Sequence, residues 1–246
     1  PYITNDGVPK DMTGADYVKP AQIKWYENEI ATLKKQYGED IGVIVEDFRA
    51  QDTTAIIDKI NQANTDPTIN GIIIQLPIRD KERTDELCDL ITPEKDVDGL
   101  GRNAKFDSAT ATAILWLLAG YDIKLENKKI AIVGRGKLVG APLYKIFTAS
   151  GYDVTLFHKG DNLTNLKNFD IIISATGVPG LISSDFISPG ATLIDAGTAS
   201  EDGVIKGDLT PDLYTRKDLA AITPVKGGVG PLTITCLFDH LLQATE

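Results

Sequence analysis

The chain has 246 residues, a formal net charge of −10, a pI of about 4.7 and 42% hydrophobic residues. An acidic chain without a block of Lys or Arg argues against nucleic acid or an anionic membrane as a partner. Its length and apolar content suit one large or two small domains with a full core.

No apolar run in the sequence approaches the length of a membrane span, and the amino end resembles neither a signal nor a transit peptide. We therefore expect a soluble protein, with no membrane partner, in the cytoplasm by default. Cys88 and Cys236 lack the spacing of a metal site and lie in apolar helical patterns. They are predicted to be reduced residues of the core, and no metal site is predicted.

The amino-terminal half alternates between predicted helices and strands. Glycine and proline interrupt the first nineteen residues, which indicates a loop. Helical patterns follow at residues 21–37, 53–63 and 84–91, and apolar runs at 41–48 and 71–76 predict strands. This alternation is typical of a parallel sheet with right-handed crossovers. An apolar helix at 110–119 then leads into a second domain.

The second domain begins with a predicted strand at 130–133, followed by Gly134, Gly136 and Gly140 and by a helical pattern from Lys137 to the stop at Ser150. Glycines allow a tight turn and close approach of a diphosphate, and the helix N-terminus attracts its negative charge. The spacing G-x-G-x-x-x-G differs from the usual G-x-G-x-x-G. A tight connection without any ligand is therefore the alternative.

A second predicted strand, 153–157, ends at His158 and Lys159, where a nucleotide-binding sheet meets the adenosine ribose. Basic residues there suit a 2′-phosphate, and Arg135 lies in the glycine turn, so NADP is favoured. The nearby carboxylate of Asp161 keeps NAD possible. The next predicted strands, 171–175 and 191–195, end in small residues that a flat cofactor could cover, namely Ala175, Thr176, Gly177 and Gly197.

Five motifs, occurring together and in order, resemble the methylenetetrahydrofolate dehydrogenase/methenyltetrahydrofolate cyclohydrolase family. They are G-I-I-I-Q-L-P-I at Gly71, P-E-K-D-V-D-G-L at Pro93, V-G-R-G-K-L-V-G-A-P at Val133, L-I-D-A-G at Leu193 and T-P-V-K-G-G-V-G-P-L-T at Thr223. The resemblance implies a homodimer of chains with two α/β domains and a cleft between them. We expect a folate-binding catalytic domain of residues 1–108 plus 231–246, and a Rossmann-type NAD(P)-binding domain with a parallel sheet at 109–230.

The family oxidises 5,10-methylenetetrahydrofolate to the methenyl cation with NAD(P), and commonly hydrolyses the product to 10-formyltetrahydrofolate. The resemblance makes Gln75 an active-site residue and Asp98 the carboxylate that holds the pterin ring, while Gly228, Gly230 and Pro231 line the folate and nicotinamide. The cofactor turn would comprise Gly134, Arg135, Gly136, Val139, Gly140 and Pro142. Gly136 replaces the serine usual in the family, and Lys159 and Gly160 stand where a serine and a basic residue are common, so the 2′-phosphate contacts do not transfer one for one.

The chain departs from the family pattern where a tyrosine is followed four residues later by the catalytic lysine. Tyr17 matches the tyrosine region, but the fourth residue after it is Ala21. Lys24, seven residues on, would return to nearly the same helical face, although Pro20 could spoil that geometry. A register based on Tyr26 places Ile30 at the lysine position and also leaves no base. Lys24 is therefore the predicted base, with Tyr17 beside the substrate.

Hydride transfer depends mainly on positioning, whereas hydrolysis of the methenyl cation requires a group that moves protons. An enzyme that keeps only the dehydrogenase activity is therefore the first alternative. A regulatory protein that binds the nucleotide without turnover is the second. A shikimate-type or amino-acid dehydrogenase is the third, and it leaves K-D-V-D-G at Lys95 unexplained.

Overall fold

The computed structural model describes residues 34–50, 52–197, 199–201 and 204–245. The chain divides into two compact units. The first covers the chain up to Phe106 together with residues 200–204 and 237–246, and the second covers residues 107–199 and 205–236. The last helix, α6 (Val229–Ala244), therefore contributes residues to both units.

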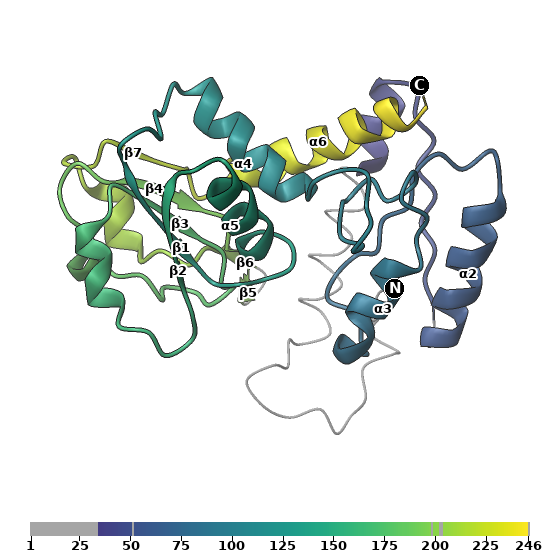
Figure 1. The fold of residues 1–246 in the computed structure, drawn as a ribbon, viewed down its shortest axis with the longest axis horizontal. Helices are drawn as coiled ribbons and strands as arrows, with labels where there is room; N and C mark the ends of the chain where they lie inside the picture. The colour runs from purple at the N-terminus through teal and green to yellow at the C-terminus, as the bar shows by residue number, and fades with distance from the viewer. Residues whose placement is uncertain (1–33, 51, 198, 202–203, 246) are drawn as a thin grey trace. The chain divides into compact units, whose positions relative to one another are not determined.

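The second unit is built on a five-stranded parallel sheet in the order β2-β1-β3-β4-β7 (Figure 1). Its strands are β1 (Lys129–Val133), β2 (Asp153–Phe157), β3 (Ile171–Ser174), β4 (Thr192–Asp195) and β7 (Ala221–Ile222). The parallel sheet predicted for the second domain is thereby confirmed. The short strands β5 (Ala199–Glu201) and β6 (Val204–Lys206), which were not predicted, form a separate pair.

Both faces of this sheet are buried, which explains why its strands are almost continuously apolar. Ile130 and Ile132 of β1 point into a core shared with helices α4 (Ala109–Gly120) and α5 (Gly140–Ala149). Ala131 and Val133 alternate with them and point into a second core. Short 3₁₀ helices cover that face: η2 (Leu163–Asn168), η3 (Ser184–Phe186) and η4 (Pro211–Thr215).

Within its described residues, the first unit is mainly helical. It contains a helix over residues 34–40, then α2 (Thr53–Thr65), η1 (Lys81–Arg83) and α3 (Thr84–Asp89). Asp52 begins α2 as a cap, because its carboxylate accepts the amide N–H of Ala55 at 2.8 Å. Both cysteines are buried, as predicted. No helix in the described part of the chain is long and apolar enough to cross a membrane.

The two strands predicted in the first unit are wrong. Among the described residues, the segment 43–50 has no assigned strand, and the segment 71–76 makes one parallel bridge, between Ile72 and Asp96. A strand requires a neighbour as well as apolar, β-branched residues, and the sequence pattern reports only the residues. Ile44, 90% exposed, shows that this part of the apolar run does not face a core.

Candidate functional site

Lys34 contacts Gln75 within the first unit. Its Nζ donates a hydrogen bond to Gln75 Oε1 at 2.9 Å, and both side chains are half-buried. Burial lowers the pKa of Lys34, and the negative charges of Asp98 and Asp47 offset only part of that effect. The amine therefore carries a larger neutral fraction near neutral pH than an exposed lysine does. A neutral amine held by an amide oxygen can act as a general base.

Asp98 is the second ionisable group of this cluster. Burial raises its pKa to about 6, with a smaller contribution from Asp96, while the positive charge of Lys34 acts in the opposite direction. The carboxylate is therefore ionised at neutral pH and can accept N–H groups from a ligand. Lys34, Gln75 and Asp98 thus combine a candidate base, its hydrogen-bond partner and an anionic acceptor.

A rigid turn holds Asp98 in place. The buried carboxylate of Asp96 accepts the amide N–H groups of Gly99 at 3.0 Å and Gly101 at 2.6 Å. The ring nitrogen Nδ1 of His240 lies 2.8 Å from the carbonyl oxygen of Val97. Asp96 therefore shapes the turn while Asp98 remains available for a ligand.

Lys95, the first residue of the same motif, fixes the turn to helix α2. Its ammonium group donates to the carbonyl oxygens of Ala63, Asn64 and Asp66 at 2.7–3.0 Å. These carbonyls belong to the last turn of α2 and to its C-cap residue, where unpaired backbone acceptors accumulate.

Sequence reasoning did not single out Lys34. Tyr17 and Lys24, the predicted tyrosine and base, lie outside the described residues, so their assignment stays a prediction. A signal for Lys34 was present nevertheless. In the register based on Tyr26, Lys34 follows Ile30 by four residues, which places it one helical turn further along the same face.

In the second unit, the glycine turn connects β1 to the N-terminus of α5 through a very close backbone approach. A Cβ atom on Gly140 would lie 1.9 Å from the carbonyl oxygen of Gly134, and Gly134 has φ +100°. Arg135 and Gly136 are exposed at this turn, Val139 is buried beneath it, and Pro142 occupies the first turn of α5, where proline is tolerated. A compact turn at a helix N-terminus fits the diphosphate of a dinucleotide.

Replacing Gly140 with alanine is expected to lower the free energy of unfolding by about 2 kcal/mol, because the new methyl group must displace backbone atoms. Gly136→Ala is the matched control, since within the part of the chain that the structure describes its Cβ would meet only the carbonyl oxygen of Ala175, at 3.9 Å. Urea unfolding of both variants measures the difference. Equal stability of the two variants would contradict this close approach.

His158 and Lys159 are exposed immediately after β2, where the sequence placed the ribose. Asp161, which kept NAD possible, is engaged locally, because one of its carboxylate oxygens accepts the amide N–H of His158 at 2.7 Å. This contact ties the carboxylate into the turn that follows β2. The basic pair therefore remains the stronger candidate for contact with a nucleotide.

The ends of β3 and β4 carry the remaining predicted cofactor residues. Ala175, Thr176 and Gly177 follow β3, and Gly177 has φ +66°. Gly197 follows β4, and a Cβ atom at this position would lie 2.1 Å from the carboxylate of Asp208. A buried neighbour therefore already requires glycine at position 197, independently of any cofactor.

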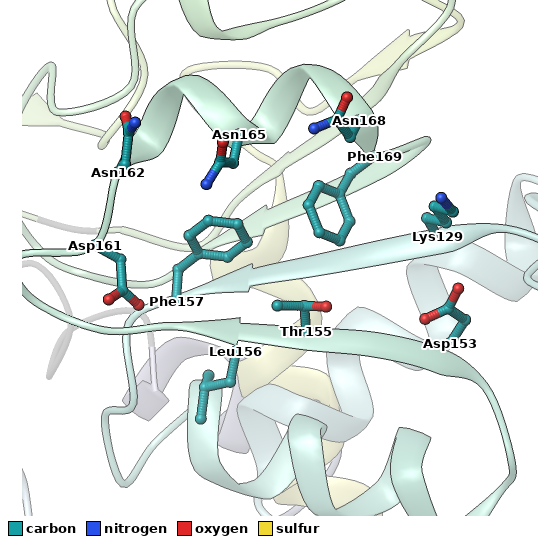
Figure 2. Close-up of a pocket in the computed structure, with 10 residues that line it drawn as sticks. All are labelled: Lys129, Asp153, Thr155, Leu156, Phe157, Asp161, Asn162, Asn165, Asn168 and Phe169. Atoms are coloured by element: carbon teal, nitrogen blue, oxygen red, sulfur yellow. The ribbon is translucent and has the colours of Figure 1, made fainter.

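Figure 2 shows a pocket of about 630 Å³ beside the edge strand β2. Asn162, Asn165 and Asn168 line it from the η2 side, and the rings of Phe157 and Phe169 meet edge to face at 5.5 Å within it. Neither the glycine turn nor the ends of β3 and β4 contribute to its lining. The pocket therefore lies apart from the glycine turn, but it borders the end of β2 through Phe157 and Asp161.

The third predicted segment, Gly228, Gly230 and Pro231, lies at the start of α6. Gly228 precedes this helix, while Gly230 and Pro231 belong to its first turn. No atom of the described residues would lie within 4 Å of a Cβ atom on Gly230, so packing among these residues does not explain that glycine. An open N-terminal turn is compatible with a ligand beside it.

A parallel sheet with a glycine turn, together with a lysine, glutamine and aspartate cluster on another unit, defines the class as a two-domain α/β dehydrogenase with an NAD(P)-binding domain. Two family models match the chain. Residues 24–98 match the tetrahydrofolate dehydrogenase/cyclohydrolase catalytic domain, and residues 108–246 match the NAD(P)-binding domain of the same family. The chain belongs to the tetrahydrofolate dehydrogenase/cyclohydrolase family.

Individual relatives agree with this assignment. The bifunctional protein FolD of Staphylococcus aureus is 37% identical over 229 residues, covering 87% of this chain and 79% of that protein. A methylenetetrahydrofolate dehydrogenase from the silkworm Bombyx mori has 32% identity and a TM-score of 0.77, covering 89% of this chain and 83% of its own. The Trypanosoma brucei dehydrogenase-cyclohydrolase, solved with NADP and an inhibitor, has 27% identity and a TM-score of 0.79, covering 89% and 82%.

Proposed function

We propose that this protein oxidises 5,10-methylenetetrahydrofolate to the 5,10-methenyl compound with NADP, and then hydrolyses the product to 10-formyltetrahydrofolate. Family membership supports both reactions. The observation that carries the second is the hydrogen bond between Lys34 and Gln75 beside the ionisable Asp98. Lys34 thereby supplies the base that the sequence pattern around Tyr17 lacks.

For the oxidation, NADP bound by the second unit would supply the acceptor for the hydride of the folate's methylene carbon. The protein contributes binding and orientation rather than a reacting side chain. Asp98 accepts N–H groups of the pterin ring, and its place on the turn held by Asp96 fixes the folate against rotation. The glycine turn and the N-terminus of α5 would hold the diphosphate of that cofactor.

In the hydrolysis, the oxygen of a water molecule adds to the methenyl carbon. Neutral Lys34 takes a proton from that water, while Gln75 Oε1 orients the amine through the bond at 2.9 Å. When the bond between this carbon and N5 breaks, N5 gains a proton. The water thus supplies the formyl oxygen and two protons, of which one ends on N5 and the other is released to solvent.

The structure favours both activities over the dehydrogenase alone, because Lys34 fills the role that Ala21 left open. A regulatory protein without turnover would not need a lysine of lowered pKa beside Asp98. NADP is preferred over NAD because Lys159 and His158 are exposed after β2, while Asp161 is tied to the turn. We also propose the cytoplasmic location and the homodimer that the family resemblance implied; light scattering on the purified chain tests the latter.

The proposal is tested by following reduced cofactor and the methenyl compound separately after mixing with methylenetetrahydrofolate and NADP. Reduction of NADP without accumulation of the methenyl compound supports both activities. Accumulation, with decay only at the spontaneous rate of hydrolysis, supports the dehydrogenase alone. If NADP gives no reduction, the same assay with NAD separates a wrong cofactor from a protein without turnover.

At acidic pH, the dependence of kcat/KM on pH should reflect protonation of Asp98. With a pKa of about 6, this carboxyl is protonated at lower pH and can no longer accept the pterin N–H groups as an anion. In the oxidation, which does not use Lys34 as a base, we expect kcat/KM for the folate to fall about tenfold per pH unit below that value. Measurements from pH 5 to 8 test this, and an Asp98→Asn variant should lack the acidic limb. A wild-type profile that stays flat across this range would exclude the role.

A further inference from the structure

Asp208 is a buried carboxylate that the proposed reactions do not use. Its side chain is fully inaccessible to solvent, at 0% exposure. One oxygen accepts the hydroxyl of Ser174 at 2.5 Å and the amide N–H of Thr176 at 2.7 Å, and the other accepts the amide N–H of Val178 at 2.9 Å. All three donors belong to the end of β3 or to the segment that follows it.

A second carboxylate holds Asp208 itself. Asp195, at the end of β4, accepts the amide N–H groups of Gly197, Asp208 and Leu209 at 3.0–3.2 Å and the hydroxyl of Tyr214 at 2.9 Å. Burial raises the pKa of Asp195, with the negative charge of Asp208 adding to the effect. The two carboxylates therefore form one network that connects the ends of two neighbouring strands.

Two glycines make room for this network in a reciprocal way. A Cβ atom on Gly197 would lie 2.1 Å from the carboxylate of Asp208, and a Cβ atom on Gly207 would lie 2.0 Å from that of Asp195. Gly197 follows Asp195 closely in the chain and Gly207 directly precedes Asp208. Each carboxylate therefore packs against the glycine that is a sequence neighbour of the other carboxylate. Burying two carboxylates is unfavourable unless hydrogen bonds satisfy them, and here seven donors do so.

We propose that Asp208 is a positioning residue for the dinucleotide: it fixes the backbone of residues 175–178 in the conformation that receives the cofactor, without touching the cofactor itself. This inference rests on the proposed function, which places the dinucleotide at the carboxyl ends of these strands. Complete burial excludes direct contact with a ligand. The amide N–H groups of Thr176 and Val178 donate to the Asp208 carboxylate, which holds the backbone of this segment in one conformation.

The test is Asp208→Asn in the full chain. Asparagine has one acceptor oxygen, so its NH₂ group must face at least one of the three N–H or O–H donors and leave it unsatisfied. We expect the Kd of NADPH, measured by its fluorescence on binding, to rise about tenfold or more. Hydrolysis of the methenyl compound requires no NADP and takes its base and its pterin contact from the first unit, so its kcat/KM should stay within about twofold.

Asp185→Asn is the matched control, because it makes the same chemical change at an exposed position of the second unit. NADPH affinity should be unchanged in this variant. The proposal is overturned if Asp208→Asn binds NADPH like the wild type, or if hydrolysis falls by the same factor as binding, which would indicate a general loss of structure.

Ser174→Ala covers the case in which Asp208→Asn does not fold, since it removes only one donor from the network. It should raise the Kd of NADPH about threefold or more with hydrolysis retained; normal binding would overturn the proposal. The NADPH titration requires no turnover. A wild-type protein that binds NADPH but neither oxidises nor hydrolyses folate would therefore refute the proposed function separately.

Discussion

Lys34→Met is expected to slow hydrolysis of the methenyl compound by about 100-fold or more, the usual contribution of a general base. Methionine retains much of the side-chain length but cannot accept a proton. It also has no N–H group, so Gln75 Oε1 loses its hydrogen-bond donor. Oxidation of the methylene compound should fall by less than about tenfold, because it depends on positioning rather than proton transfer. The methenyl compound should therefore accumulate during turnover.

Lys35→Met is the matched control. Lys35 is the next residue of the same helix and is exposed, whereas the hydrogen bond to Gln75 comes from Lys34. Its substitution should leave both rates unchanged. If Lys34→Met still hydrolyses at the wild-type rate, the base lies elsewhere, and Lys24→Met, assayed in parallel, tests the lysine that the sequence favoured.

The sequence predicted the second unit far better than the first. Residues 130–133 and 171–174 are buried on both faces, so their apolar runs directly mark β1 and β3. Residues 41–48 have a similar composition, yet the structure assigns no strand to them. Local composition reports the tendency of a segment to be extended, but not whether a partner strand is available.

The same distinction applies to functional residues. Gln75 and Asp98 could be predicted because each lies within a contiguous motif. Lys34 was not predicted, because the register based on Tyr26 was its only signal and its role depends on a contact with a residue 41 positions away. The network of Asp195 and Asp208 was missed for the same reason: L-I-D-A-G indicated only a strand end, and the sequence around Gly207 carried no recognised motif.

Asp98→Asn is expected to reduce kcat/KM for the folate in both reactions by about 100-fold, equivalent to about 2.7 kcal/mol for a charge-assisted hydrogen bond. The affinity for NADPH should be unchanged, since the proposed dinucleotide contacts lie in the other unit. An equal loss in oxidation and hydrolysis distinguishes this residue from Lys34, whose substitution affects mainly hydrolysis. Steady-state kinetics of the two reactions measures both effects.

Stability provides the control for this variant. The pKa of Asp98 in the folded chain is about 6, against 3.8 for an unperturbed aspartate, so the folded state holds its proton more tightly. Stability associated with the protonated carboxyl is therefore present at acidic pH and is lost as the pH rises through about 6. A neutral amide removes that penalty, so Asp98→Asn should unfold at no lower Tm than the wild type at pH 8. A weakened folate interaction in a variant of undiminished stability would place Asp98 on the substrate, whereas a fall in Tm with equal loss of NADPH binding would make it a structural residue.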